Sequence, residues 1–121
     1  MLFNLAQTNS TLYKENAELR KNLTASLKVI QNSGTELSPE VIEELKAYNA
    51  EARNVLSDLK ASQGSIRNII ADNKENIKAL DYEAMKAAFA EIASIQSTRN
   101  SQLAEINQAL ESIRHIYRDY L

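Results

Sequence analysis

Cysteine is absent from this chain of 121 residues, and glycine, proline and histidine are scarce, with two, one and one residues. The lack of cysteine excludes disulfides, thiolate zinc sites and thiol catalysis. An all-β fold needs turn residues every ~8–12 positions, and so few glycines and prolines argue against it. They also argue against a disordered chain rich in these two residues. The composition therefore favours a helical domain.

Neither an excess of positive charge nor a long apolar run is present. Fourteen Lys and Arg stand against sixteen Asp and Glu, for a net charge of −2. Nucleic-acid-binding domains usually carry a clear basic excess, so no nucleic-acid partner is predicted. No apolar run approaches the ~20 residues that a membrane span needs, so no transmembrane segment is predicted. The first residues have neither a basic start nor an apolar core of signal-peptide length, and the residues alone leave the localisation undetermined.

Two breaks divide the chain into three predicted helices within a single domain, residues 1–121. Gly34 can adopt the left-handed conformation that ends a helix, so the first helix is predicted over about 3–32. Ser38 as N-cap and Pro39 at the first helical position predict that the second helix begins at about 39. Asp81 is a second N-cap, which ends the second helix near 79 and starts a third over about 82–120.

Gly64 lies in the middle of the predicted second helix. Glycine inside a helix lowers its stability by ~1 kcal/mol relative to alanine, but it does not by itself end the helix. The apolar periodicity continues across Gly64, so we expect a continuous helix, with a bend or a break at Gly64 as the alternative.

Apolar residues recur at intervals of three and four along all three segments. In the second segment the stripe follows strict intervals of seven, with Asn73 as its one polar member: Leu45, Ala52, Leu59, Ile66, Asn73 and Leu80. A sustained heptad stripe is typical of long helices packed side by side. The predicted fold is all-α, an elongated antiparallel three-helix bundle in which a long helical hairpin packs against a shorter N-terminal helix. Helices of ~40 residues would be ~60 Å long.

Folding the segments up and down about their breaks predicts a polar layer halfway along the bundle. The residues brought to this level are Asn9, Ser62, Gln63, Gln96 and Arg99. Polar groups in such layers usually fix the register of the helices, and we interpret this one in that way rather than as a site of chemistry.

No constellation for catalysis or metal binding is found. His115 is the one imidazole, and helical spacing places only Glu111 and Asp119 near it, so we interpret it as an exposed helical histidine. The Glu-x-x-His pair of di-metal bundles does not occur. We therefore predict no enzymatic activity, no catalytic or metal-binding residue and no cofactor.

The far end of the hairpin is predicted to carry an uncovered apolar surface. The first helix is too short to pass the level of Ile69, which leaves these apolar residues beyond it: Ile70, Ile77, Met85, Phe89 and Ile92. Soluble monomers rarely expose large contiguous apolar patches. A second copy of the chain, a client protein or a segment before Met1 could cover it. Self-association is favoured because a two-fold dimer needs only one self-complementary patch.

Two stretches of this sequence resemble helical-hairpin proteins of bacterial envelopes. They are Leu37-Ser38-Pro39-Glu40 and the helix that begins Asp81-Tyr82-Glu83-Ala84-Met85 and continues with Phe89, Ile92, Gln96, Arg99, Leu103 and Ile106. The chain is similar, over about 12–113, to small secreted helical proteins of clostridia-like bacteria, which have no assigned function, and to the Spy/CpxP-like periplasmic chaperones. The resemblance implies an extracytoplasmic or secreted protein.

Together these features predict a non-enzymatic protein-interaction or scaffold module of the bacterial envelope or a secreted one. The alternatives are an extracytoplasmic chaperone that binds unfolded clients and a cytoplasmic coiled-coil oligomerisation domain. A protein partner is expected in each case.

Overall fold

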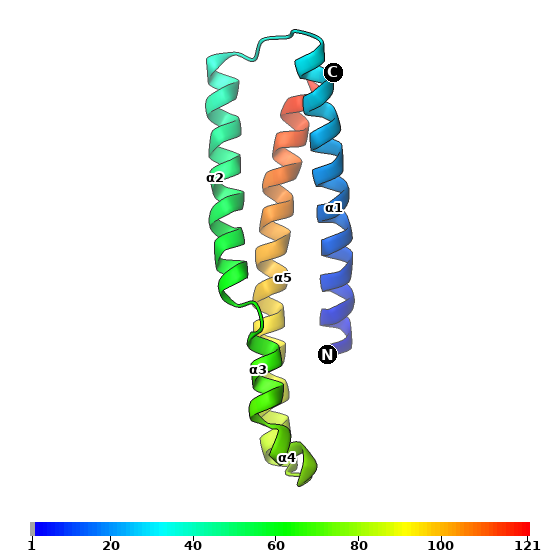
Figure 1. Ribbon diagram of the computed structural model, residues 1–121, viewed down its shortest axis with the longest axis vertical. Helices are drawn as coiled ribbons and strands as arrows, with labels where there is room; N and C mark the ends of the chain where they lie inside the picture. The colour runs from blue at the N-terminus through cyan, green and yellow to red at the C-terminus, as the bar shows by residue number, and fades with distance from the viewer. Residues whose placement is uncertain (1) are drawn as a thin grey trace.

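The computed structural model describes residues 2–121, which form helices and loops without a strand. The helices are α1 (Leu2–Asn32), α2 (Pro39–Ala61), α3 (Ser65–Asp72), α4 (Lys74–Lys78) and α5 (Tyr82–Arg118). The all-helical fold is thus confirmed, and the long C-terminal helix α5 packs against the other four. Figure 1 shows an elongated molecule in which α5 lies between α1 and α2.

The helix ends follow the predicted capping residues. The Ser38 hydroxyl accepts a hydrogen bond from the Val41 amide at 3.3 Å, with Pro39 at the start of α2. The Asp81 carboxylate accepts one from the Ala84 amide at 3.1 Å at the start of α5. Each side chain satisfies an amide that the first helical turn leaves unpaired.

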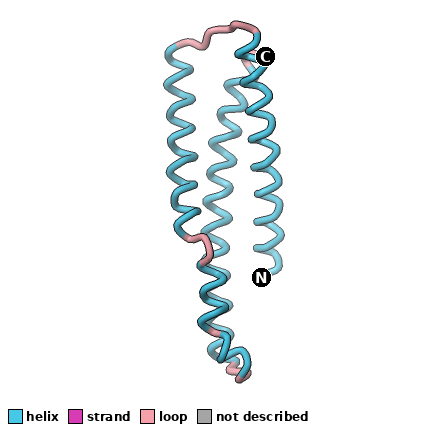
Figure 2. Tube along the Cα trace, viewed as in Figure 1, coloured by secondary structure: helices cyan, strands magenta, loops and turns pink. Residues whose placement is uncertain are grey.

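The expected continuity of the second helix through Gly64 is wrong. Helix α2 ends at Ala61, and α3 begins at Ser65 after a short turn, shown as loop in Figure 2. Gly64 has a φ of 83°, a left-handed conformation that glycine adopts without the steric penalty of other residues. Hydrogen bonds from Gln63 to Lys60 and from Ser65 to Ser62 replace the helical pattern there.

A second break separates α3 from α4 at Asn73. Its side-chain amide donates to the Ile69 carbonyl at 2.8 Å, which satisfies a backbone acceptor near the end of α3. Side chains of this type compete with the helical backbone for hydrogen bonds, so asparagine favours helix ends. The predicted helix over 39–79 is therefore three consecutive helices.

The helices are arranged around α5 rather than around a shared axis. The α1 and α2 helices both pack against α5, but within residues 2–121 no Cα of α1 lies within 8 Å of a Cα of α2. Figure 1 shows α1 running in the same direction as α5 and α2 in the opposite direction. The α3 and α4 helices cover the N-terminal part of α5, beyond the start of α1.

The apolar core is divided into three clusters along α5. The cluster near the α1–α2 loop contains Ile30, Leu45, Ile113 and Tyr117. The middle cluster contains Val55, Leu59, Leu103 and Ile106. The cluster at the far end, the tip, contains Ile69, Ala88 and Ile92. Every cluster includes residues of α5, so this helix is the common element of the core. No helix of the described part of the chain is long and apolar enough to cross a membrane.

Candidate functional site

The separation of α1 from α2 leaves a groove over the middle of α5, which we call the α5 groove. Its volume is about 720 Å³, and residues of α1, α2 and α5 line it. Leu59, Leu103, Ile106 and Leu110 provide an apolar base, and Leu56 and Tyr13 stand at its sides. The groove lining stops at Arg20 on α1 and Asn49 on α2; toward the connecting loop, side chains of both helices join the first core cluster. The α5 groove is therefore an apolar trough over the middle of α5.

The charged residues that line the α5 groove are all cations. Arg20 comes from α1, Arg53 and Lys60 from α2, and Arg99 from α5, and no described aspartate or glutamate lines the groove. Adjacent to Arg20, a second hollow along α1 adds Lys21 and Lys28, again without an acidic residue. This face is thus basic although the chain has a net charge of −2.

The acidic residues of α1 are on another side of the helix. Glu15 and Glu18 line a separate hollow, together with Glu111 and Arg114 of α5. Charges of opposite sign are therefore segregated around α1, and the cations gather beside the groove.

Arg99 links α5 to the end of α2. Its guanidinium donates a 2.7 Å hydrogen bond to the Leu59 carbonyl and a second, short one to the Ser62 hydroxyl. Carbonyls in the last turn of a helix lack helical partners and carry a partial negative charge. A cation from the neighbouring helix satisfies both requirements, and so Arg99 supports the end of α2, where the turn that ends at Gly64 begins.

Two layers of paired asparagines join α1 to α5. The Asn9 amide donates to the Asn100 oxygen at 2.9 Å, and the Asn100 amide donates to the Leu5 carbonyl at 3.0 Å. One heptad further along, Asn16 donates to Asn107 at 2.9 Å, and Asn107 to the Leu12 carbonyl at 3.0 Å. Both pairs are separated by 91 residues, which requires α1 and α5 to run parallel.

Four of the five residues of the predicted polar layer are divided between two helix interfaces, and Gln63 belongs to neither. Ser62 and Arg99 are hydrogen-bonded to each other between α2 and α5. Asn9 and Gln96 both donate to the Asn100 oxygen, on the side of α5 that faces α1. Gln63 is exposed and lines the α5 groove.

The sequence interpretation missed Asn100 and Asn107, which are buried. The signal that could have found them is the matched spacing of seven between Asn9 and Asn16 and between Asn100 and Asn107.

The predicted tip residues differ in exposure. Ile70, Phe89 and Ile77 are 51%, 45% and 37% exposed, whereas Met85 is half-buried. Ile92 does not belong to the exposed surface: it is buried against Ile69 and Ala88. The correction arises because α3 packs against this part of α5 and covers Ile92.

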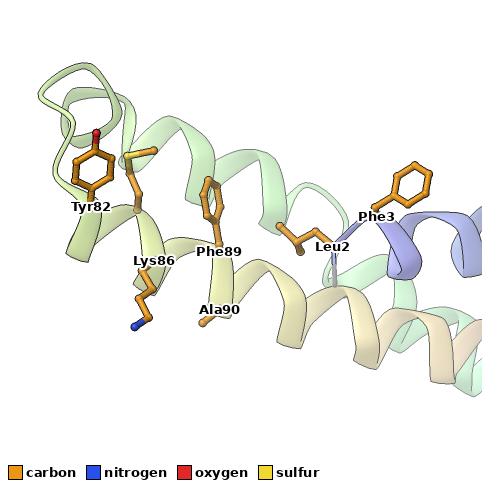
Figure 3. Close-up of a pocket in the computed structure, with 7 residues that line it drawn as sticks. Leu2, Phe3, Tyr82, Lys86, Phe89 and Ala90 are labelled. Carbon is orange, nitrogen blue, oxygen red and sulfur yellow. The ribbon is translucent and has the colours of Figure 1, made fainter.

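An apolar hollow of about 740 Å³ lies at the tip, beside the start of α1. Figure 3 shows Tyr82, Phe89 and Lys86 on α5, with Leu2 and Phe3 at the beginning of α1. Phe3 was not among the predicted tip residues, because the register placed the tip beyond the reach of α1.

Self-association through the tip stays a prediction, and a double substitution tests it. Replacing Ile70 and Phe89 together with Glu is expected to produce a monomer that keeps its helicity, because both side chains are exposed and a carboxylate at each would oppose apolar contact. Sedimentation equilibrium measures the mass, and circular dichroism measures the helicity. A matched substitution of the exposed Val29 by Glu should leave the mass unchanged. Persistence of a dimer in the double variant would place the interface elsewhere.

The one histidine of the chain lies in the last turn of α5. His115 is exposed, with its Nε2 3.7 Å from Glu111 Oε1, and Glu111 also pairs with Arg114. Burial raises the pKa of the Tyr117 hydroxyl, so this group stays neutral to a higher pH than a free tyrosine. Within residues 2–121, no group of three or more His, Asp or Glu residues is placed to hold a metal ion.

Comparison of the chain with protein-family models, with curated proteins and with solved structures finds no match. The site is therefore interpreted from its own geometry.

Proposed function

We propose that this chain is a non-enzymatic protein-interaction module: an antiparallel helical bundle that is open along α5 and binds a helix of another protein in the α5 groove. The observation that supports the proposal is the groove itself, an apolar trough between two helices that pack on α5 but not on each other. A further helix laid in the trough would turn an open arrangement into a four-helix bundle.

The dimensions of the groove suit this occupant. Its lining on α5 extends from Arg99 to Leu110, which at 1.5 Å per residue corresponds to about 17 Å, or three helical turns. Amphipathic helices bind such grooves through apolar side chains spaced three, four and seven residues apart. Leu56 is 39% exposed on α2 and is available to contact such a side chain.

A chaperone that binds unfolded clients is the second candidate, and the exposed apolar tip favours it. Phe3, Tyr82 and Phe89 are exposed large apolar side chains at this end of the molecule. A chaperone would bind extended apolar segments as well as helices, whereas the α5 groove requires a helix.

A labelled model peptide tests the proposal. It has about three heptads, with leucine at the two seam positions and uncharged polar residues elsewhere. We expect fluorescence anisotropy to show binding to the wild-type chain, and Leu56→Glu to weaken this binding at least tenfold, because the new carboxylate would be desolvated by an apolar ligand. Val29→Glu, outside the groove, should bind like the wild type.

Two results would contradict the groove proposal: no binding to the wild-type chain, or equal binding to the Leu56→Glu variant with its helicity intact. A peptide of the same composition with two central prolines cannot form the helix and is expected not to bind. Equal binding of this peptide would favour the chaperone.

A further inference from the structure

We propose that the helix received by the α5 groove is acidic, with carboxylates on both of its flanks. This inference rests on the proposed function and names the chemistry of the partner. It is carried by the cations that stand on both sides of the apolar base, Arg20 on α1 and Arg53 and Lys60 on α2.

These cations have no acidic partner of their own. Within residues 2–121, the ion pairs closer than 4.0 Å are Lys46–Glu43, Arg114–Glu111 and His115–Glu111, and none involves a cation of the groove. The groove is therefore a region of unneutralised positive charge beside an apolar surface. Such a region favours an apolar ligand that brings negative charge to its edges.

The spacing of the cations matches the repeat of a helix. Arg53 and Lys60 are seven residues apart on α2, and Lys21 and Lys28 are seven apart on α1, in the hollow that adjoins the groove. In packed helices the residues that flank the apolar seam form ion pairs across the interface and determine the choice of partner. The groove itself presents Arg53 and Lys60 on its α2 side and Arg20 on its α1 side, and glutamates at the flanking positions of the bound helix would face them.

The position of the acidic residues supports the same assignment. Glu15 and Glu18 of α1 are directed to a different hollow, so the helix beside the groove presents one sign of charge to it. A nucleic acid would also seek cations, but single strands stack successive bases on several aromatic side chains, whereas Tyr13 is the one aromatic residue among the described residues that line the groove.

Three peptides with the same leucine seam test the inference, with glutamate, glutamine or lysine at the flanking positions. We expect the glutamate peptide to bind about tenfold more tightly than the lysine peptide at low salt, with the glutamine peptide between them, since each exposed ion pair contributes modestly. The difference should shrink as salt is raised to 1 M. Polyglutamate without the leucine seam should not compete.

Charge reversal provides the decisive variant. Arg53→Glu with Lys60→Glu is expected to invert the preference, so that the lysine peptide binds more tightly than the glutamate peptide. The control, Lys78→Glu with Lys86→Glu, makes the same change in net charge at the tip and should keep the wild-type order of affinities.

The outcomes separate this inference from the proposed function. If all three peptides bind the wild-type chain equally, the groove binds helices but does not select acidic ones, and the inference is overturned. If none binds, the proposed function fails as well. Displacement of the glutamate peptide by an oligothymidine would overturn the inference in favour of a nucleic-acid ligand.

Discussion

Replacement of Leu103 by Ala is expected to lower the free energy of unfolding by about 3–5 kcal/mol, the upper part of the range for a buried leucine. Leu103 is 2% exposed and belongs to the middle core cluster with Val55 and Leu59 of α2. Leu12 of α1 packs against the same cluster. Because α1 and α2 are joined through α5 at this level, a cavity at Leu103 weakens the packing of both helices.

Urea denaturation followed by circular dichroism measures this effect. The matched control is Leu56→Ala, which makes the same truncation at a side chain that is 39% exposed on the side of the groove. We expect the free energy of unfolding of the control to fall by less than about 1.5 kcal/mol, because folding buries less apolar area at this position. Equal losses in the two variants would contradict the placement of Leu103 in the core.

Replacement of Arg99 by Ala is expected to lower the free energy of unfolding by about 1.5–3 kcal/mol, the range for hydrogen bonds to charged groups. The substitution removes the donor to the Leu59 carbonyl and to the Ser62 hydroxyl, and it removes a positive charge from the C-terminus of α2. Arg99→Lys should recover part of the loss, because an ammonium keeps the charge but not the planar arrangement of donors.

The control for Arg99 is Arg118→Ala, which removes an exposed arginine from the last turn of α5. This substitution should change the free energy of unfolding by no more than about 0.5 kcal/mol, as most surface substitutions do. A loss of the same small size in Arg99→Ala would show that the end of α2 does not depend on α5. Urea denaturation measures both variants.

The helix ends could be predicted because their causes are local. Ser38, Pro39 and Asp81 act on amides within their own first turn, so the sequence alone contains the whole interaction. The break at Gly64 could not be predicted from periodicity, because the turn preserves the apolar phase. The break is accompanied by a hydrogen bond from Arg99, which lies 37 residues from Ser62.

The asparagine layers show a second limit. Following one apolar stripe along α5 finds one packed side, but α5 is packed by α1 and by α2–α4. Ala93, Asn100 and Asn107 are buried, yet they do not fall on the three-and-four spacing that joins Phe89, Ile92, Leu103 and Ile106. A helix that is packed on two sides needs two stripes of buried residues. The second stripe of α5 contains alanine and asparagine, which indicate burial only weakly in a sequence.

The open groove could not be predicted at all. A heptad stripe indicates that one face of a helix is covered, but it does not say which neighbour covers it. The sequence is also compatible with α1 packing on α2. In the structure, the path of the loop between Asn32 and Pro39 and the pairing of α1 with α5 keep α1 apart from α2. The basic lining of the site follows from that separation.

The parallel pairing of α1 with α5 also determines the order in which the molecule assembles and opens. The asparagine pairs join residues 91 positions apart, whereas Arg99 and Leu59 are 40 apart. Contacts between distant residues require the larger loss of chain entropy, so we expect α2 and α5 to associate before α1 docks. The α1 and α2 helices are each held against α5 and not against each other, so either can detach while the other stays packed on α5. A helix bound in the groove would contact both α1 and α2 and would thus slow the detachment of either.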